Sequence, residues 1–148
     1  MAITSTLTTS FKKELLQGVH NFNKASSPDT FKLALYSSSA SLDAATDGYT
    51  TSNEVSGSGY SAGGNALASK AVTENSTSGV FDAADPEWTS ATFTARGALI
   101  YNKTLYDSDN SRGAIAVLDF GGDFTVSGGT FKIVFPAATA SNAIVRID

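Results

Sequence analysis

The residues of this sequence that could take part in catalysis are few, and the histidine is the first to test. His20 is the only histidine, and there is no cysteine. A catalytic triad would pair His20 with an activated serine, but the G-x-S-x-G elbow that presents such a serine is absent. Metal sites built from histidine and cysteine are excluded by count. We therefore predict no catalytic residue, no cofactor and no enzyme, with His20 a partly exposed capping or packing residue.

An acidic run could hold a cation. Residues 107–111 read D-S-D-N-S and place oxygen ligands at alternating positions, as the start of a calcium loop does. The pattern then fails, because Arg112 replaces the tight-turn glycine and Leu118 replaces the bidentate glutamate. A solvated acidic hairpin loop is the better interpretation, and we predict no metal site.

A tryptophan beside acidic side chains could bind sugar. Trp88 is the only tryptophan, and it follows three carboxylates, Asp82, Asp85 and Glu87. A tryptophan in a β protein of this size is more often a core anchor, and we favour that interpretation. The segment Gly57-Ser58-Gly59 does not form the G-x-G-x-x-G fingerprint of a dinucleotide site, and turn chemistry explains it.

Length and charge limit the function classes further. The 148 residues suit a single domain, 1–148, with a net charge of −4 and an isoelectric point near 4.8. This charge argues against binding nucleic acid or an anionic membrane. No apolar run approaches a membrane span or a secretory signal, so we expect a protein that stays soluble unless it is exported by lysis or as part of a particle.

One helix is predicted, near the N-terminus. Thr9 or Ser10 can cap its start, and Gly18 suits the position just after its end. Its apolar side chains fall on one stripe that must pack on the rest of the protein: Phe11, Leu15 and Leu16.

The remaining pattern is typical of strands. From Thr30 the apolar residues alternate, which predicts a strand over 30–36, and the segment 88–102 predicts two central strands joined or bent at Gly97. Seven to nine short strands are expected in all, the others at 65–73, 78–83, 113–120, 124–126, 130–135 and 142–148, with turns at 74–77, 121–123 and 127–129. This pattern predicts a mainly β fold, an antiparallel β-sandwich of jelly-roll or Greek-key type, with a closed barrel as the alternative.

Two segments lack a strand pattern. Residues 1–10 fit a loose extended arm or an edge strand, and residues 37–64 form a long loop rich in serine, alanine and glycine. A loop of this length needs anchors, for which Leu42, Tyr49, Val55 and Tyr60 are well spaced. We expect a short turn or helix near residues 50–55, and glycines that let the loop lie against a neighbouring backbone.

Over most of its length, about residues 11–147, the sequence resembles a family of small structural proteins of tailed bacteriophages. The resemblance is carried, in order, by F-K-K-E-L-L-Q-G-V-H-N-F, D-T-F-K-L-A-L-Y-S-S-S-A-S-L, Y-T-T-S-N-E-V-S-G-S-G-Y-S-A-G-G, W-T-S-A-T-F-T-A-R-G-A-L-I-Y-N, A-V-L-D-F-G-G-D-F-T-V-S-G-G-T-F-K-I-V-F-P and N-A-I-V-R-I. The insertion at residues 103–112 departs most from the pattern.

The resemblance implies a virion component, and we expect a capsid decoration (cement) protein. It would be made in the host cytoplasm and bind the major capsid protein at the outer surface of the shell, as a homo-oligomer, a trimer or dimer. The alternatives are a tail, head-completion or fibre-associated subunit, or a carbohydrate-binding module that uses Trp88, Tyr49 or Tyr60. The residues that we expect at an interface are Ile3, Leu7, Tyr49, Tyr60 and Arg96.

Overall fold

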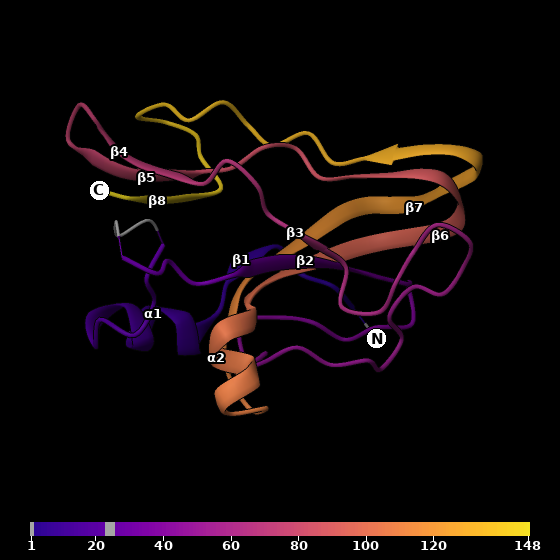
Figure 1. The fold of residues 1–148 in the computed structure, drawn as a ribbon, viewed down its shortest axis with the longest axis horizontal. Helices are drawn as coiled ribbons and strands as arrows, with labels where there is room; N and C mark the ends of the chain where they lie inside the picture. Colours follow the sequence, from indigo (N-terminus) through magenta and orange to yellow (C-terminus); the bar gives the residue numbers. More distant parts are fainter. Residues whose placement is uncertain (1, 23–25) are drawn as a thin grey trace.

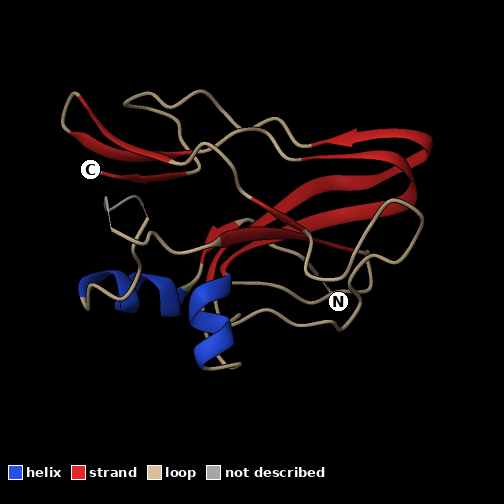
Figure 2. Cartoon of the chain, viewed as in Figure 1, coloured by secondary structure: helices blue, strands red, loops and turns tan. Residues whose placement is uncertain are grey.

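The computed structural model describes residues 2–22 and 26–148, and its fold is mainly β, as the sequence predicts. Two antiparallel sheets lie over one another as a β-sandwich, with a short helix near the N-terminus (Figure 1). Figure 2 shows the sheets as the bulk of the molecule and both helices at one end. The predicted fold class is confirmed.

The larger sheet has five strands in the order β1-β7-β6-β2-β3, and the smaller has three in the order β4-β5-β8. The strands span Thr6–Leu7 (β1), Phe31–Tyr36 (β2), Asn65–Ala66 (β3), Ala71–Asn75 (β4), Ser78–Asp82 (β5), Glu87–Asn102 (β6), Ala114–Lys132 (β7) and Val145–Ile147 (β8). Between the sheets, Phe31 of β2 lies 5.9 Å from the ring of Phe81 of β5, and Phe22 stacks on Phe31 at 4.6 Å. The two sheets therefore share one aromatic core.

The outer face of β2 is buried as well. Ala34 and Tyr36 are fully buried, although the period-two pattern predicts a single apolar face. Residues 37–64 cover this face, where Leu42 is buried as predicted. The loop also turns before Glu54, and Val55 is buried in the core on the other face of β2. The predicted loose arm also packs on the outer face, because Ile3 bridges to Leu42 and is only 8% exposed. The loop and the N-terminal segment thus form a third layer.

Strands β6 and β7 form one long ribbon that folds back on itself (Figure 1). The predicted bend at Gly97 is confirmed as a register shift between Ala95 and Gly97 within one continuous strand. The turns predicted at 121–123 and 127–129 are wrong, since β7 runs through both. Pairing with β6 holds the strand together, while Gly121 (φ 78°) and Gly128 (φ 62°) bend it without ending it.

The strand predicted over 65–73 is divided between the two sheets as β3 and β4. Ser69, at φ 53°, turns the chain between them. The last strand is shorter than predicted, and β4 extends into the predicted turn at 74–77.

Helix α1 (Thr9–Leu16) begins earlier than predicted, because its N-cap is Thr8 and not Thr9 or Ser10. Gly18 follows it at φ 67°, as expected. Phe11 and Glu14 are its buried residues, whereas Leu16 is 91% exposed, so the predicted stripe is wrong at that position. A second helix, α2 (Lys103–Ser108), occupies the insertion for which we predict a loop.

Thr8 joins this helix to the sheet. Its hydroxyl accepts a hydrogen bond from Phe11 N at 3.2 Å and donates one to the Ala114 carbonyl at 2.9 Å. We expect Thr8→Val to lower the free energy of unfolding by about 1–2 kcal/mol, because it removes a cap and leaves a buried carbonyl unpaired. Urea denaturation measures this, with the exposed Thr9→Val as the control, which should stay within about 0.5 kcal/mol of the original chain.

Within residues 2–22 and 26–148, no helix is long and apolar enough to cross a membrane.

Candidate functional site

The two tyrosines expected at an interface instead meet at one carboxylate of their own chain. Tyr49 and Tyr60 each donate a hydroxyl hydrogen bond of 2.6 Å to Glu54, and Gly63 N donates a third bond of 2.7 Å. The Tyr60 hydroxyl also accepts from Leu35 N of β2 at 2.9 Å. Both hydroxyls are thus committed to fastening the long loop.

Burial keeps these phenols protonated. It raises the pKa of Tyr60 and of Tyr49 well above the ordinary value, and the hydrogen bonds to Glu54 add to the effect. Neither group is poised to act as an acid or base near neutral pH.

His20 lies in a second closed network. Its side chain is completely buried, so the predicted partial exposure is wrong, and it packs 5.1 Å from the Phe11 ring. Nε2 lies 2.8 Å from Glu14 and Nδ1 lies 3.1 Å from the Asn102 amide nitrogen, which also donates to Asp29 at 2.7 Å. A neutral imidazole that donates from Nε2 and accepts at Nδ1 satisfies every partner. The network holds α1 against the end of β6.

This network should make stability depend on pH. Burial lowers the pKa of His20 below its ordinary value of 6.5, although Glu14 acts in the opposite direction. The unfolded chain therefore binds a proton more readily than the folded one, and stability should fall as pH drops through about 6.5 toward the folded pKa. His20→Gln should lose stability at pH 8 but decline less steeply below it. Urea denaturation of both chains between pH 8 and 5 measures the difference, and parallel profiles would contradict it.

Trp88 is a core anchor, as the sequence predicts. It is 3% exposed, and its ring lies 6.1 Å from both Tyr60 and Phe131. Of the acids nearby, Asp85 pairs with Lys132 at 3.6 Å and accepts a hydrogen bond from Phe135 N. Trp88 therefore presents no open ring on which a sugar could stack.

The acidic run near residue 107 is helical at its start, which corrects the predicted hairpin loop. Asp107 pairs with Lys103 one turn earlier in α2, and Asp109 accepts both Ser111 donors. No group of three or more histidine, cysteine, aspartate or glutamate side chains in the described part of the chain is placed to hold a metal ion.

Three other residues expected at an interface have partners within the chain. Ile3 is in the core, and Leu7 packs against it from β1. Arg96 sits at the bulge of β6 and pairs with Asp119 at 3.2 Å and with Asp123 at 3.9 Å, with its side chain 36% exposed. Arg96 therefore keeps part of its side chain available to a partner.

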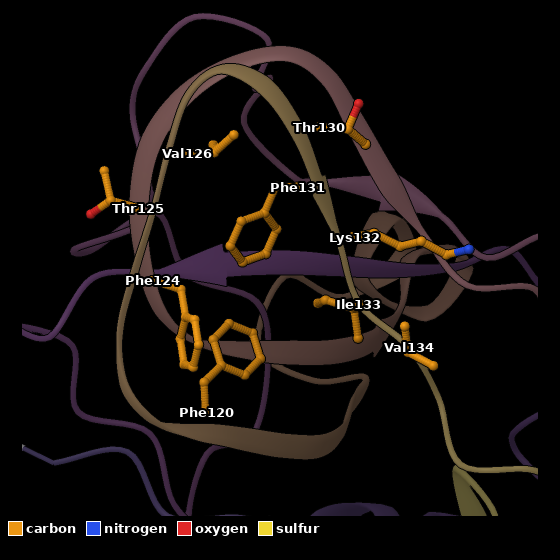
Figure 3. Close-up of a pocket in the computed structure, with 9 residues that line it drawn as sticks. All are labelled: Phe120, Phe124, Thr125, Val126, Thr130, Phe131, Lys132, Ile133 and Val134. Atoms are coloured by element: carbon orange, nitrogen blue, oxygen red, sulfur yellow. The ribbon is translucent and has the colours of Figure 1, made fainter.

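An open apolar hollow lies at the bend of the ribbon, and residues of β7 and of the segment that follows it form its lining (Figure 3). Its volume is about 490 Å³, and its lining is Phe120, Phe124, Thr125, Val126, Thr130, Phe131, Lys132, Ile133 and Val134. The rings of Phe120, Phe124 and Phe131 converge inside the curve of β7 (Figure 3). Phe124 is 53% exposed and Val134 is 73% exposed, so the hollow opens the core of the sandwich to solvent.

The hollow exists because most of β7 pairs with another strand along one edge only. β6 pairs along its inner edge, but β1 reaches only Ala116 and Val117 on its outer edge. Beyond that point the ribbon curves back and leaves its concave face uncovered at the rim (Figure 3).

The predicted turns concealed this site by placing its apolar residues in separate strands. One signal is present in the sequence from Phe120 to Phe135: the large apolar residues fall on even numbers before Gly128 and, except for Val134, on odd numbers after it, namely Phe120, Phe124 and Val126, then Phe131, Ile133 and Phe135. That switch is what one extra bulge residue in a continuous strand would produce.

We compared the chain with protein-family models, with curated proteins and with solved structures, and none of them matches it.

Proposed function

We propose that this protein is a structural component of a tailed-phage virion, a capsid decoration protein that binds the outer surface of the shell and acts without catalysis. The virion role rests on the ordered sequence resemblance across residues 11–147. The structural rather than catalytic role rests on how the polar and apolar groups are distributed.

The observation that carries the proposal is the open apolar hollow. Glu54 and His20, the centres of the two polar networks, have their hydrogen-bonding groups committed to neighbours in the fold. By contrast, Phe124 and Val134 leave apolar surface in water at the rim of the hollow. Exposed apolar surface beside a rigid scaffold favours association with another protein over turnover of a small substrate.

The long loop is the surface that best suits the shell. Residues 37–64 expose mainly serine, threonine, asparagine and glycine, which cost little to desolvate. Gly57, Gly59 and Gly64 press the loop so closely on β2 and β6 that no Cβ would fit. A loop held this firmly loses little entropy on binding, and many copies on a shell add avidity.

Copy number in purified particles tests the proposal. A decoration protein should be present at a copy number close to that of the major capsid protein on quantitative gels. About six or twelve copies, as closed rings of a tail or portal would give, would overturn the capsid assignment and favour a tail or head-completion subunit. Complete absence from particles would overturn the virion role itself.

A further inference from the structure

We propose that a second copy of this chain closes the hollow, with the outer edges of the two β7 strands paired antiparallel about a twofold axis between Ser127 and Gly128. This goes beyond the virion role, because it names the partner of the hollow and the register of the contact.

The outer edge of β7 is available for such pairing. In the described residues, β1 pairs with Ala116 and Val117 and the Ser5 hydroxyl accepts from Asp119 N, but no strand covers the edge from Phe120 to Lys132. A long uncovered edge presents unpaired backbone donors and acceptors in a row. Another strand with matching spacing satisfies them, and this is how β-augmentation works.

The sequence of this edge is complementary to itself when read in the opposite direction. Between Phe120 and Phe135 the only charged residues are Asp123 and Lys132, of opposite sign. About the proposed axis, Asp123 of one copy lies opposite Lys132 of the other. Their side chains are 51% and 48% exposed, so each can reach outward in addition to its own intrachain partner.

The same register matches the other side chains. It places Phe124 opposite Phe131 of the second copy, and Thr125 opposite Thr130. Both phenylalanines point into the hollow and both threonines point away from it (Figure 3). Directly opposite residues of an antiparallel pair must lie on the same face of a sheet. The proposed register meets this requirement for both the phenylalanine pair and the threonine pair.

The bend in β7 has the shape that the symmetry needs. A twofold axis between antiparallel strands runs perpendicular to the sheet. It therefore places the arm of β7 before the bend in one copy beside the arm after the bend in the other copy. The curve turns between Val126 and Thr130 (Figure 3), and Gly128, at φ 62°, lies within this stretch beside the proposed axis. The open sides of the two hollows, at the outer edges of β7, then face each other. Each copy covers the exposed Phe124 of the other.

This complementarity favours a second copy over an unrelated peptide. An arm from a shell protein could supply an apolar strand, but nothing in this chain would then require opposite charges at equal distances from the bend. An isologous contact benefits from that arrangement, because the contact between Asp123 and Lys132 then forms twice about the axis.

Charge exchange tests the register. Sedimentation equilibrium should show a dimer for the original chain, and Asp123→Lys or Lys132→Asp should each raise the dissociation constant about tenfold or more, because each places two like charges together. Mixing the two variants should restore dimers, since every contact between them then joins opposite charges. Lys12→Asp on α1 and Glu74→Lys on β4 of the smaller sheet change exposed charges outside the edge from Phe120 to Lys132, so they are the matched controls and should leave the dimer unchanged.

Introduced cysteines give a second measurement that does not depend on charge. The chain has no cysteine, so Thr125→Cys mixed with Thr130→Cys should form a disulfide between chains under mild oxidation. Thr125→Cys mixed with Thr94→Cys, which lies on β6 next to Thr125, should not.

A chain that stays monomeric up to millimolar concentration would overturn the proposal. A dimer that survives the charge variants, or that the mixture fails to restore, would overturn the register. If the monomer binds shells and Phe124→Ser abolishes that binding, the hollow serves the shell protein and the dimer proposal fails. Each result is separate from the virion role, which particle copy number decides.

Discussion

Replacing Gly64 by alanine is expected to destabilise the fold by about 4 kcal/mol or more, close to the whole stability of many small domains. A Cβ at this position would lie 1.8 Å from the Leu33 carbonyl oxygen and 2.6 Å from its carbonyl carbon. Both atoms belong to the backbone of β2, which cannot move without disturbing β6. Gly64 also has φ +70°, where alanine is strained.

Urea denaturation at pH 7.5 measures this loss, or the absence of soluble folded protein shows it directly. Gly122→Ala is the matched control, because nothing lies within 4 Å of its Cβ position and its φ is not positive. That change should be neutral or slightly stabilising. A Gly64 variant within about 1 kcal/mol of the original chain would mean that the loop does not lie this close to β2.

Replacing Glu54 by alanine is expected to cost about 3–5 kcal/mol, since three hydrogen bonds end on this carboxylate and each bond to a charged group contributes about 1.5–3 kcal/mol before relaxation. The loss should be local as well as global. Without Glu54, residues 37–64 lose the attachment of Tyr49, Tyr60 and Gly63, and limited proteolysis should cut within the loop while the sheets still hold.

Glu54→Gln separates the acceptor from the charge. Its amide oxygen can still accept two bonds, so we expect about half the cost of the alanine variant and a loop that resists protease. Glu74→Ala, on the exposed β4–β5 hairpin, is the control for removing a glutamate and should stay within about 0.5 kcal/mol. Equal stability of the Glu54→Ala and Glu74→Ala chains would contradict the role of this carboxylate.

The sequence predicts well the elements whose pattern is local. The alternation over residues 30–36 places β2 within one residue, and Gly18 marks the end of α1. The burial of both faces of β2 could not be predicted in this way, because it depends on a loop and an N-terminal segment that lie nearby only in the folded chain. Tyr36 looked like a polar-side residue until that third layer was in place.

Glycine misled the prediction of the ribbon. The segments Gly121-Gly122-Asp123 and Ser127-Gly128-Gly129 have the composition of turns, and in isolation they would end a strand. Here β6 offers a partner along the whole length, so pairing outweighs the local preference. The two predicted turns also hide the hollow from sequence-based prediction, because they would interrupt the strand whose concave face forms it.

The partners that the candidate interface residues have within the chain could not be predicted, for a related reason. The spacing of Tyr49 and Tyr60 predicts that they anchor the loop, and both hydroxyls bond Glu54, which composition alone does not single out. Ile3 lies in a mostly polar segment without a core pattern, which predicts a loose arm or an edge strand, whereas its partner in the fold, Leu42, is distant in sequence.

The central position of β2 has a consequence for synthesis on the ribosome. β2 ends at Tyr36, but its long neighbour is the segment of β6 from Gly97 to Asn102. At about 5–20 residues per second, the nascent strand must wait for seconds with Phe31, Leu33 and Leu35 unpaired. Lys32 is the only charge within it, and such a charge discourages premature pairing with other chains. We therefore expect β2, the first largely buried strand to be synthesised, to need protection by a chaperone until residue 102 has left the exit tunnel.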